Sequence, residues 1–123
     1  MKLLLDSVIL IDHFNNIQAA TGYIRKHQKN IAISVITRAE VLAGFHQSAH
    51  TDLAKRLLDR FILYPIYAAE ADLGAHLRKQ YGLKLPDALQ AAIAMMHQLT
   101  LVTRNTKDFN PKKHPFVMVP YVL

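Results

Sequence analysis

Four acidic side chains occupy places where a carboxylate could do chemistry. Asp6 directly follows an apolar run, Glu40 interrupts an apolar helical stretch, and Asp87 opens another helix. Asp108 follows a further apolar run, together with the neutral oxygen donor Asn105. If these residues converge, their charges raise one another's pKa unless a cation neutralises them. Oxygen donors without cysteine select a hard cation, Mg²⁺ or Mn²⁺, which can activate water and neutralise a phosphodiester.

Each of these residues also has a plainer explanation. Asp6 lies at a strand end, where ligands bind in open α/β sheets, but it could equally cap the following helix. The dipole of its helix favours Asp87 by about 0.3–1 kcal/mol without any metal. Asn105 could cap a short helix, and Asp108 could pair with Lys107 or cap a turn. The joint pattern therefore carries more weight than any single acid.

Glu40 is the most ambiguous candidate. It shares its helix face with the small residues Ala43 and Gly44, which leave room for another element to come close. It could also be a solvated side chain that pairs with Arg38. Three basic residues beside the acidic motifs are candidates for phosphate contacts or for ordinary surface charge: Arg38, Lys84 and Arg104.

Alternating strand and helix patterns surround these acids. Short apolar runs predict strands over 2–5, 31–35, 62–64, 99–103 and 116–119. Apolar spacing and helix-favouring residues predict helices over 7–14, 17–27, 37–47, from Thr51 or Asp52 onward, over 68–81 before Gly82, and from Pro86 onward. This alternation indicates an α/β layer fold with a short, mainly parallel central sheet of about four or five strands.

Length and composition limit the classes of protein to which the chain can belong. Its 123 residues are 51% hydrophobic and carry a formal net charge of +6, with no cysteine. We therefore expect one domain over residues 1–123, without disulfides, thiolate metal sites or a cysteine nucleophile. The basic balance favours a polyanionic partner, such as nucleic acid or an acidic protein segment.

The N-terminus carries no pattern for membrane insertion or export. No apolar run is long enough to cross a bilayer, and Asp6 ends the Leu3–Leu5 run before it could form a signal peptide. We expect a mature chain that begins at Met1, resides in the cytoplasm and has no membrane partner.

Four motifs together resemble the PIN-domain ribonucleases, and specifically the VapC toxins of bacterial and archaeal VapBC toxin–antitoxin pairs. The match covers essentially the whole chain, and four motifs in this order are a strong signal. They are LLDSVILID at 4–12, ISVITRAEVLAG at 33–44, LKLPDALQAAIA at 83–94 and LTLVTRNTKDF at 99–109. The resemblance implies a PIN-like three-layer α/β/α sandwich.

The resemblance also implies a Mg²⁺- or Mn²⁺-dependent endoribonuclease. Asp6, Glu40 and Asp87 would then bind the metal, which positions a water for in-line attack on the scissile phosphate. The family often has a fourth acid after the Thr-Arg pair, where this chain has the neutral Asn105. Asp108 is therefore the candidate for the missing fourth charge, and Asn105 for orienting a water. These five residues are the predicted catalytic set.

A second departure from the family pattern is Val8, where the family often has Asn or Ser. Its hydrogen bond would come from elsewhere, with Ser7 as the candidate. The resemblance further implies a homodimer, an RNA substrate with tRNA among the candidates, and inhibition by a cognate VapB-type antitoxin whose C-terminal segment covers the site. Four aromatic residues could line a groove for that segment or simply belong to the core: Phe14, Tyr23, Phe45 and Phe61.

Other classes of function compete with the nuclease hypothesis. Asn105 and Val8 favour a catalytically weak or inactive PIN-like module that binds RNA or protein without cutting. A metal-dependent phosphatase fits less well, since it would want a second Asp where Val8 stands. His46 and His50 are the one i, i+4 histidine pair, and two ligands make an incomplete zinc site. Asp12 stays unassigned because it could lie near Asp6.

Overall fold

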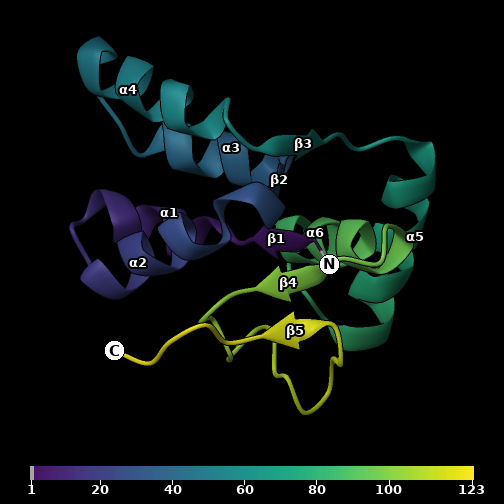
Figure 1. Cartoon of the computed structure of the whole chain (residues 1–123). Coiled ribbons are helices and arrows are strands. Elements are labelled where there is room, and N and C mark those ends of the chain that lie inside the picture. The colour runs from purple at the N-terminus through teal and green to yellow at the C-terminus, as the bar shows by residue number, and fades with distance from the viewer. Residues whose placement is uncertain (1) are drawn as a thin grey trace.

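Five short parallel strands form the central sheet in the computed structural model, which describes residues 2–123 (Figure 1). They are β1 (Leu3–Leu5), β2 (Ile31–Ser34), β3 (Ile62–Tyr64), β4 (Thr100–Val102) and β5 (Val117–Met118). Their order is β3-β2-β1-β4-β5, and every pairing is parallel, with Leu3 opposite both Ile31 and Thr100. Met1, where we expect the mature chain to begin, lies outside the described residues.

Six α-helices and one 3₁₀ turn connect the strands. They are α1 (Ser7–Phe14), α2 (Gln18–His27), η1 (Gln28–Asn30), α3 (Val35–Ala43), α4 (Ser48–Leu58), α5 (Ala68–Tyr81) and α6 (Leu85–Met96). Three predicted helix boundaries were wrong by two residues or more. Helix α3 ends at Ala43, followed by its C-cap Gly44, rather than at Gln47, and two helices begin earlier than predicted. Helix α3 begins two residues before Thr37 because the Ser34 hydroxyl accepts a hydrogen bond from the Thr37 amide at 3.1 Å and caps the helix. Helix α4 begins at Ser48 rather than at Thr51 or Asp52, and the Thr51 hydroxyl instead donates back to the Gln47 carbonyl.

The sheet separates two hydrophobic cores, as the alternation of side chains along each strand requires. Leu4 and Ala32 pack with α5 and α6 on one face. Leu3, Leu5 and Ile33 pack with residues of α1, α2, α3 and α4 on the other face. The predicted three-layer α/β/α sandwich is confirmed.

The four aromatic residues that were candidates for a groove belong to the core between the sheet and helices α1 to α4. Phe61 is buried, and Phe14, Tyr23 and Phe45 pack against the same cluster while partly exposed. The rings of Phe14 and Phe45 meet edge to face with centroids 5.2 Å apart. These two residues also line a small concavity of about 110 Å³ beside Ile11. Among residues 2–123, no helix is long and apolar enough to span a membrane.

The strand order reverses beside β1, which lies between β2 and β4. The chain leaves β1 toward β2 and β3, and later returns to β4 on the other side of β1. In open parallel sheets, ligands bind beyond the carboxyl ends of the strands at such a switch point. Residues that directly follow β1 and β4 are therefore those best placed to form a site.

Candidate active site

Asp6 lies at the switch point and is held from two sides. Its amide donates to the Val102 carbonyl at 2.9 Å, which continues the β1–β4 pairing. One carboxylate oxygen accepts from the Ser7 amide at 2.9 Å, and the other accepts from the Thr103 hydroxyl at 2.8 Å. Asp6 is thus the N-cap of α1 and also a pocket residue, so its two predicted uses coexist. Burial raises its pKa, and these hydrogen bonds oppose that rise.

A buried network of polar side chains from β2, α3 and α6 lies next to Asp6. The Gln90 side chain accepts a short hydrogen bond from the Ser34 hydroxyl and donates to the Thr37 hydroxyl at 2.8 Å. The Thr37 hydroxyl in turn donates to the Leu5 carbonyl at 3.2 Å. A hydrogen bond from Gln90 also lowers the pKa of Asp6. The network ties α3 and α6 to the end of β1, and so fixes the three elements that carry acids.

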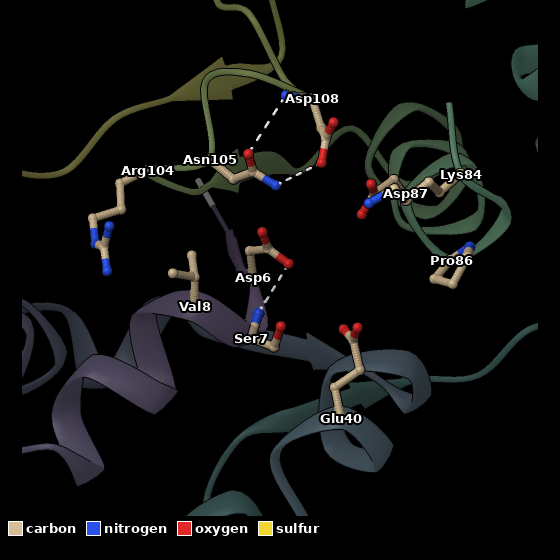
Figure 2. A pocket seen from close by; sticks show the side chains of 10 residues that line it. All are labelled: Asp6, Ser7, Val8, Glu40, Lys84, Pro86, Asp87, Arg104, Asn105 and Asp108. Carbon is tan, nitrogen blue, oxygen red and sulfur yellow. Dashed lines mark hydrogen bonds between the residues drawn. The ribbon is translucent and has the colours of Figure 1, made fainter. Parts of the chain in front are cut away.

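The predicted acids come together in one pocket of about 460 Å³ (Figure 2). Their side chains reach it from the start of α1, from α3, from the first turn of α6 and from the loop after β4. The lining residues are Asp6, Ser7, Val8, Glu40, Lys84, Pro86, Asp87, Arg104, Asn105 and Asp108. All five residues of the predicted catalytic set therefore line one pocket.

The carboxylates of the pocket oppose one another's ionisation. Partial burial and the nearby charges of Asp108, Asp6 and Glu40 raise the pKa of Asp87 to about 6, against the smaller effect of Lys84. Burial also raises the pKa of Glu40, with a further contribution from the charge of Asp6. A cation in the pocket would relieve this repulsion.

The loop after β4 places Asp108 through Asn105. The Asn105 amide group donates to a carboxylate oxygen of Asp108 at 2.9 Å, and the Asn105 backbone amide donates to the Thr103 hydroxyl at 3.0 Å. Phe109, which follows Asp108, is completely buried and anchors the loop. Thr103 thus links this loop to Asp6, and Asn105 holds a carboxylate at the pocket without carrying charge itself.

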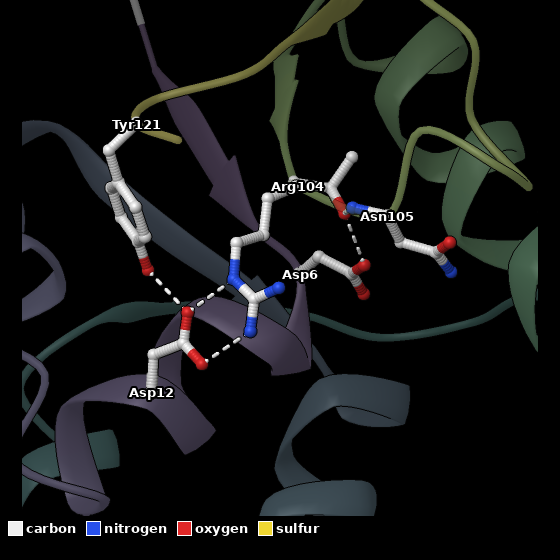
Figure 3. Close-up of polar contacts among 6 residues, drawn as sticks. Asp6, Asp12, Arg104, Asn105 and Tyr121 are labelled. Atoms are coloured by element: carbon white, nitrogen blue, oxygen red, sulfur yellow. Dashed lines mark hydrogen bonds and ion pairs between the residues drawn. The ribbon is translucent and has the colours of Figure 1, made fainter. Parts of the chain in front are cut away.

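The three basic candidates have different surroundings. Lys84 lines the pocket. Arg38 does not line it, and its guanidinium pairs at 2.9 Å with Asp59 rather than with Glu40. Arg104 lines the pocket while making a two-pronged ion pair with Asp12 (Figure 3).

Sequence reasoning missed three residues that shape the site, Thr103, Gln90 and Tyr121, and left Asp12 without a role. Thr103 and Gln90 support Asp6, and Asp12 and Tyr121 hold Arg104. A hydroxyl directly after a strand was the available signal for Thr103, since that strand pairs with β1. The other contacts join segments that are far apart in the chain and left no local signal.

The donor set of the pocket fits a hard divalent cation. Its ligand atoms are carboxylate, amide and hydroxyl oxygens, the type that Mg²⁺ and Mn²⁺ prefer. Within residues 2–123, no three acidic or histidine side chains already form a closed metal-binding cluster. The fit therefore rests on the chemistry of the donors and on the mutual repulsion of their charges.

These features define an α/β domain with an acidic pocket at the switch point of a parallel sheet. Residues 3–113 match the PIN domain family. The chain belongs to this family, as its four motifs predicted, and its fold is the one expected.

Solved structures agree with this assignment. The chain is 37% identical to a chain in a toxin–antitoxin complex from Klebsiella pneumoniae, with a TM-score of 0.91, covering 99% of this chain and 100% of that one. It is 25% identical to a chain of VapBC2 from Rickettsia felis bound to a promoter DNA fragment, with a TM-score of 0.78 and 96% coverage of each chain. FitAcB from Neisseria gonorrhoeae, at 23% identity, a TM-score of 0.77 and coverage of 98% and 99%, shares the fold. Comparison with curated protein sequences gives no significant match.

Proposed function

We propose that this protein is a Mg²⁺- or Mn²⁺-dependent endoribonuclease that acts as the toxin of a toxin–antitoxin pair. The observation that carries the proposal is the convergence of Asp6, Glu40, Asp87 and Asp108 on one pocket at the sheet switch point. PIN domains are generally nucleases, and the net charge of +6 suits a polyanionic substrate.

Six of the pocket residues have roles in the proposed mechanism. Asp6 and Asp87 would hold the cation, and Glu40 would bind it directly or through water. Asp108, held by Asn105, would complete the ligand set or orient a water. When bound, the cation would supply an activated water and neutralise charge on the phosphodiester. Outside this set, Lys84 stands at the pocket, where its ammonium would attract a phosphate oxygen.

The relatives with known structures support a proposal for the partners. Because the similar Klebsiella chain was solved in a toxin–antitoxin complex, we propose a cognate VapB-type antitoxin that covers the acidic pocket. The protein would act in the cytoplasm as a homodimer on RNA, with tRNA among the candidate substrates. Light scattering of the purified protein, alone and with the product of a neighbouring small reading frame, would test both assemblies.

The nuclease proposal is tested by removing the charge of single pocket acids. Asp6→Asn and Asp87→Asn should lower RNA cleavage in Mn²⁺ by at least about a hundredfold, the scale of losing one preorganised electrostatic contact at an active site. Excess EDTA should abolish cleavage by the wild-type protein. Asp72→Asn, which changes an exposed acid of α5 outside the pocket, is the matched control and should cleave normally. Wild-type rates in either pocket variant, or in EDTA, would refute the mechanism.

A binding module that does not cut is the second candidate. The neutral Asn105 and the apolar Val8 at the pocket favour it, because neither contributes charge to a second metal position. This alternative predicts RNA binding without cleavage and no thermal shift at millimolar Mn²⁺. The nuclease predicts stabilisation by the cation, since a ligand that binds only the folded state raises its stability.

A further inference from the structure

Arg104 lines the acidic pocket, and its guanidinium is held there by an ion pair. Its Nε donates to one oxygen of Asp12 at 2.6 Å, and its Nη2 donates to the other at 2.7 Å. The Tyr121 hydroxyl donates to the same carboxylate at 2.8 Å. These residues come from the loop after β4, from α1 and from the C-terminal segment, so three separate parts of the chain meet here (Figure 3).

The burial of Asp12 explains why the contact is strong. The Asp12 side chain is 5% exposed and that of Arg104 is 33% exposed. A buried carboxylate is costly without a partner, whereas a guanidinium fork matches both of its oxygens. The hydrogen bond from Arg104 accordingly lowers the pKa of Asp12, which keeps the carboxylate ionised.

The remaining nitrogen of Arg104 lies on the side of the pocket. Asp12 occupies Nε and Nη2, and Figure 3 shows the third nitrogen, Nη1, pointing away from Asp12 toward the side of Asp6. Arg104 also lines the pocket. The two bonds to Asp12 therefore hold the guanidinium beside the acids and leave its third nitrogen on the pocket side, where a phosphate could accept from it.

We propose that Arg104 is a phosphate-contacting residue of this pocket, and that Asp12 and Tyr121 are positioning residues that orient its Nη1 toward the phosphodiester. The inference rests on the proposed nuclease function. Orienting the guanidinium in advance avoids the entropic cost of ordering a long flexible side chain at the moment of binding. Through Tyr121, the C-terminal segment would help to orient this arginine.

RNA binding in EDTA isolates the phosphate contact from cleavage. The logarithm of the affinity of a labelled single-stranded RNA would be measured against the logarithm of KCl concentration. Loss of one phosphate contact reduces the magnitude of this slope by about 0.7 for a single strand. We expect that reduction for Arg104→Ala. Asp12→Asn should keep the wild-type slope because the positively charged guanidinium of Arg104 is still present.

Cleavage kinetics in Mn²⁺ test the positioning role. Asp12→Asn should lower kcat about tenfold with KM changed less than about twofold, because charge is kept while orientation is lost. Asp59→Asn, which breaks the exposed ion pair with Arg38 outside the pocket, is the matched control and should leave kcat and KM unchanged. If Asp12→Asn does not fold, Tyr121→Phe removes a single hydroxyl and should still lower kcat about two- to fivefold.

The possible outcomes separate this inference from the proposed function. If the contact is purely structural, Arg104→Ala should melt at a lower temperature but keep the wild-type salt slope. Folded Asp12→Asn or Tyr121→Phe should then keep the wild-type kcat. These results would overturn this inference and leave the proposed nuclease function standing. Absence of cleavage by the wild-type protein, with the slope change still present in Arg104→Ala, would overturn the nuclease and keep Arg104 as a phosphate contact. Absence of RNA binding by the wild-type protein would overturn both.

Discussion

Stabilisation of the protein by Mn²⁺ should increase with pH over the range in which Asp87 ionises. Burial and the charges of Asp108, Asp6 and Glu40 raise the pKa of Asp87 from 3.8 to about 6. Between these values the folded state binds more protons than the unfolded state, so the metal-free protein loses stability as pH rises. The cation has the opposite preference, because it binds the ionised carboxylate. Metal and proton therefore compete for Asp87.

The size of the effect follows from mass action. At pH 7.5 and a Mn²⁺ concentration of about 100 times Kd, the free energy of unfolding should rise by about 2.7 kcal/mol. For a domain of this length, about 4 °C per kcal/mol converts that gain into a shift of about 10 °C. At pH 5, one unit below the pKa, about a tenth of Asp87 is ionised, and tenfold weaker binding costs about 1.4 kcal/mol. The expected shift is then about 5 °C.

Thermal denaturation at pH 5.0 and 7.5, with Mn²⁺ or with EDTA, measures both effects. Asp87→Asn should be more stable than the wild-type protein in EDTA at pH 7.5, because the repulsion between carboxylates is reduced. Its shift in Mn²⁺ should be small and similar at the two pH values. Asp72→Asn serves as the control and should behave like the wild-type protein. Equal Mn²⁺ shifts of the wild-type protein at both pH values, or a full shift in Asp87→Asn, would refute this reasoning.

Three further substitutions test how the site and fold are built. Thr103→Val removes the hydroxyl that donates to Asp6, so the pKa of Asp6 should rise further and the Mn²⁺ concentration needed for half-maximal thermal shift should increase about tenfold. Gln90→Leu leaves the buried hydroxyls of Ser34 and Thr37 without this partner, and chemical denaturation should show a loss of about 2–4 kcal/mol. Gly82→Ala places a side chain at φ +68° after α5 and should cost about 1 kcal/mol in the same assay, whereas a neutral result would show that this turn relaxes.

Local signals were sufficient to predict most elements and the location of the site. Strand β3 and helices α1 and α5 have the predicted bounds, since a following Pro65, a preceding Asp6 and the turn residue Gly82 mark their ends. The acids could be found because the carboxyl ends of parallel strands meet at one edge of the sheet. The helix starts at Val35 and Ser48 were harder to predict, because the apolar pattern does not change sharply at either residue.

The ion pairs between residues far apart in the chain could not be predicted from local sequence patterns. Asp59 lies between Arg56 and Arg60 in the sequence, but it pairs with Arg38, which is 21 residues away. Asp12 and Arg104 are 92 residues apart, and nothing near either residue indicates the other. Such pairs depend on how α1, α3 and the last loop are packed against the sheet, which a single sequence does not specify residue by residue.

These pairings change how the net charge bears on the proposed RNA substrate. Of the nine acids, four line the pocket, Asp12 and Asp59 are held by arginines, and Glu70 is buried against the Tyr67 amide. Only Asp52 and Asp72 remain as ordinary surface acids, whereas Arg38 and Arg104 are the only lysines or arginines with an ion pair among residues 2–123. Outside the pocket, basic side chains therefore far outnumber unpaired acidic ones. Phosphates would be attracted by this excess of positive charge, while the pocket itself would repel them until a cation neutralises its acids, so metal and RNA should bind with positive cooperativity.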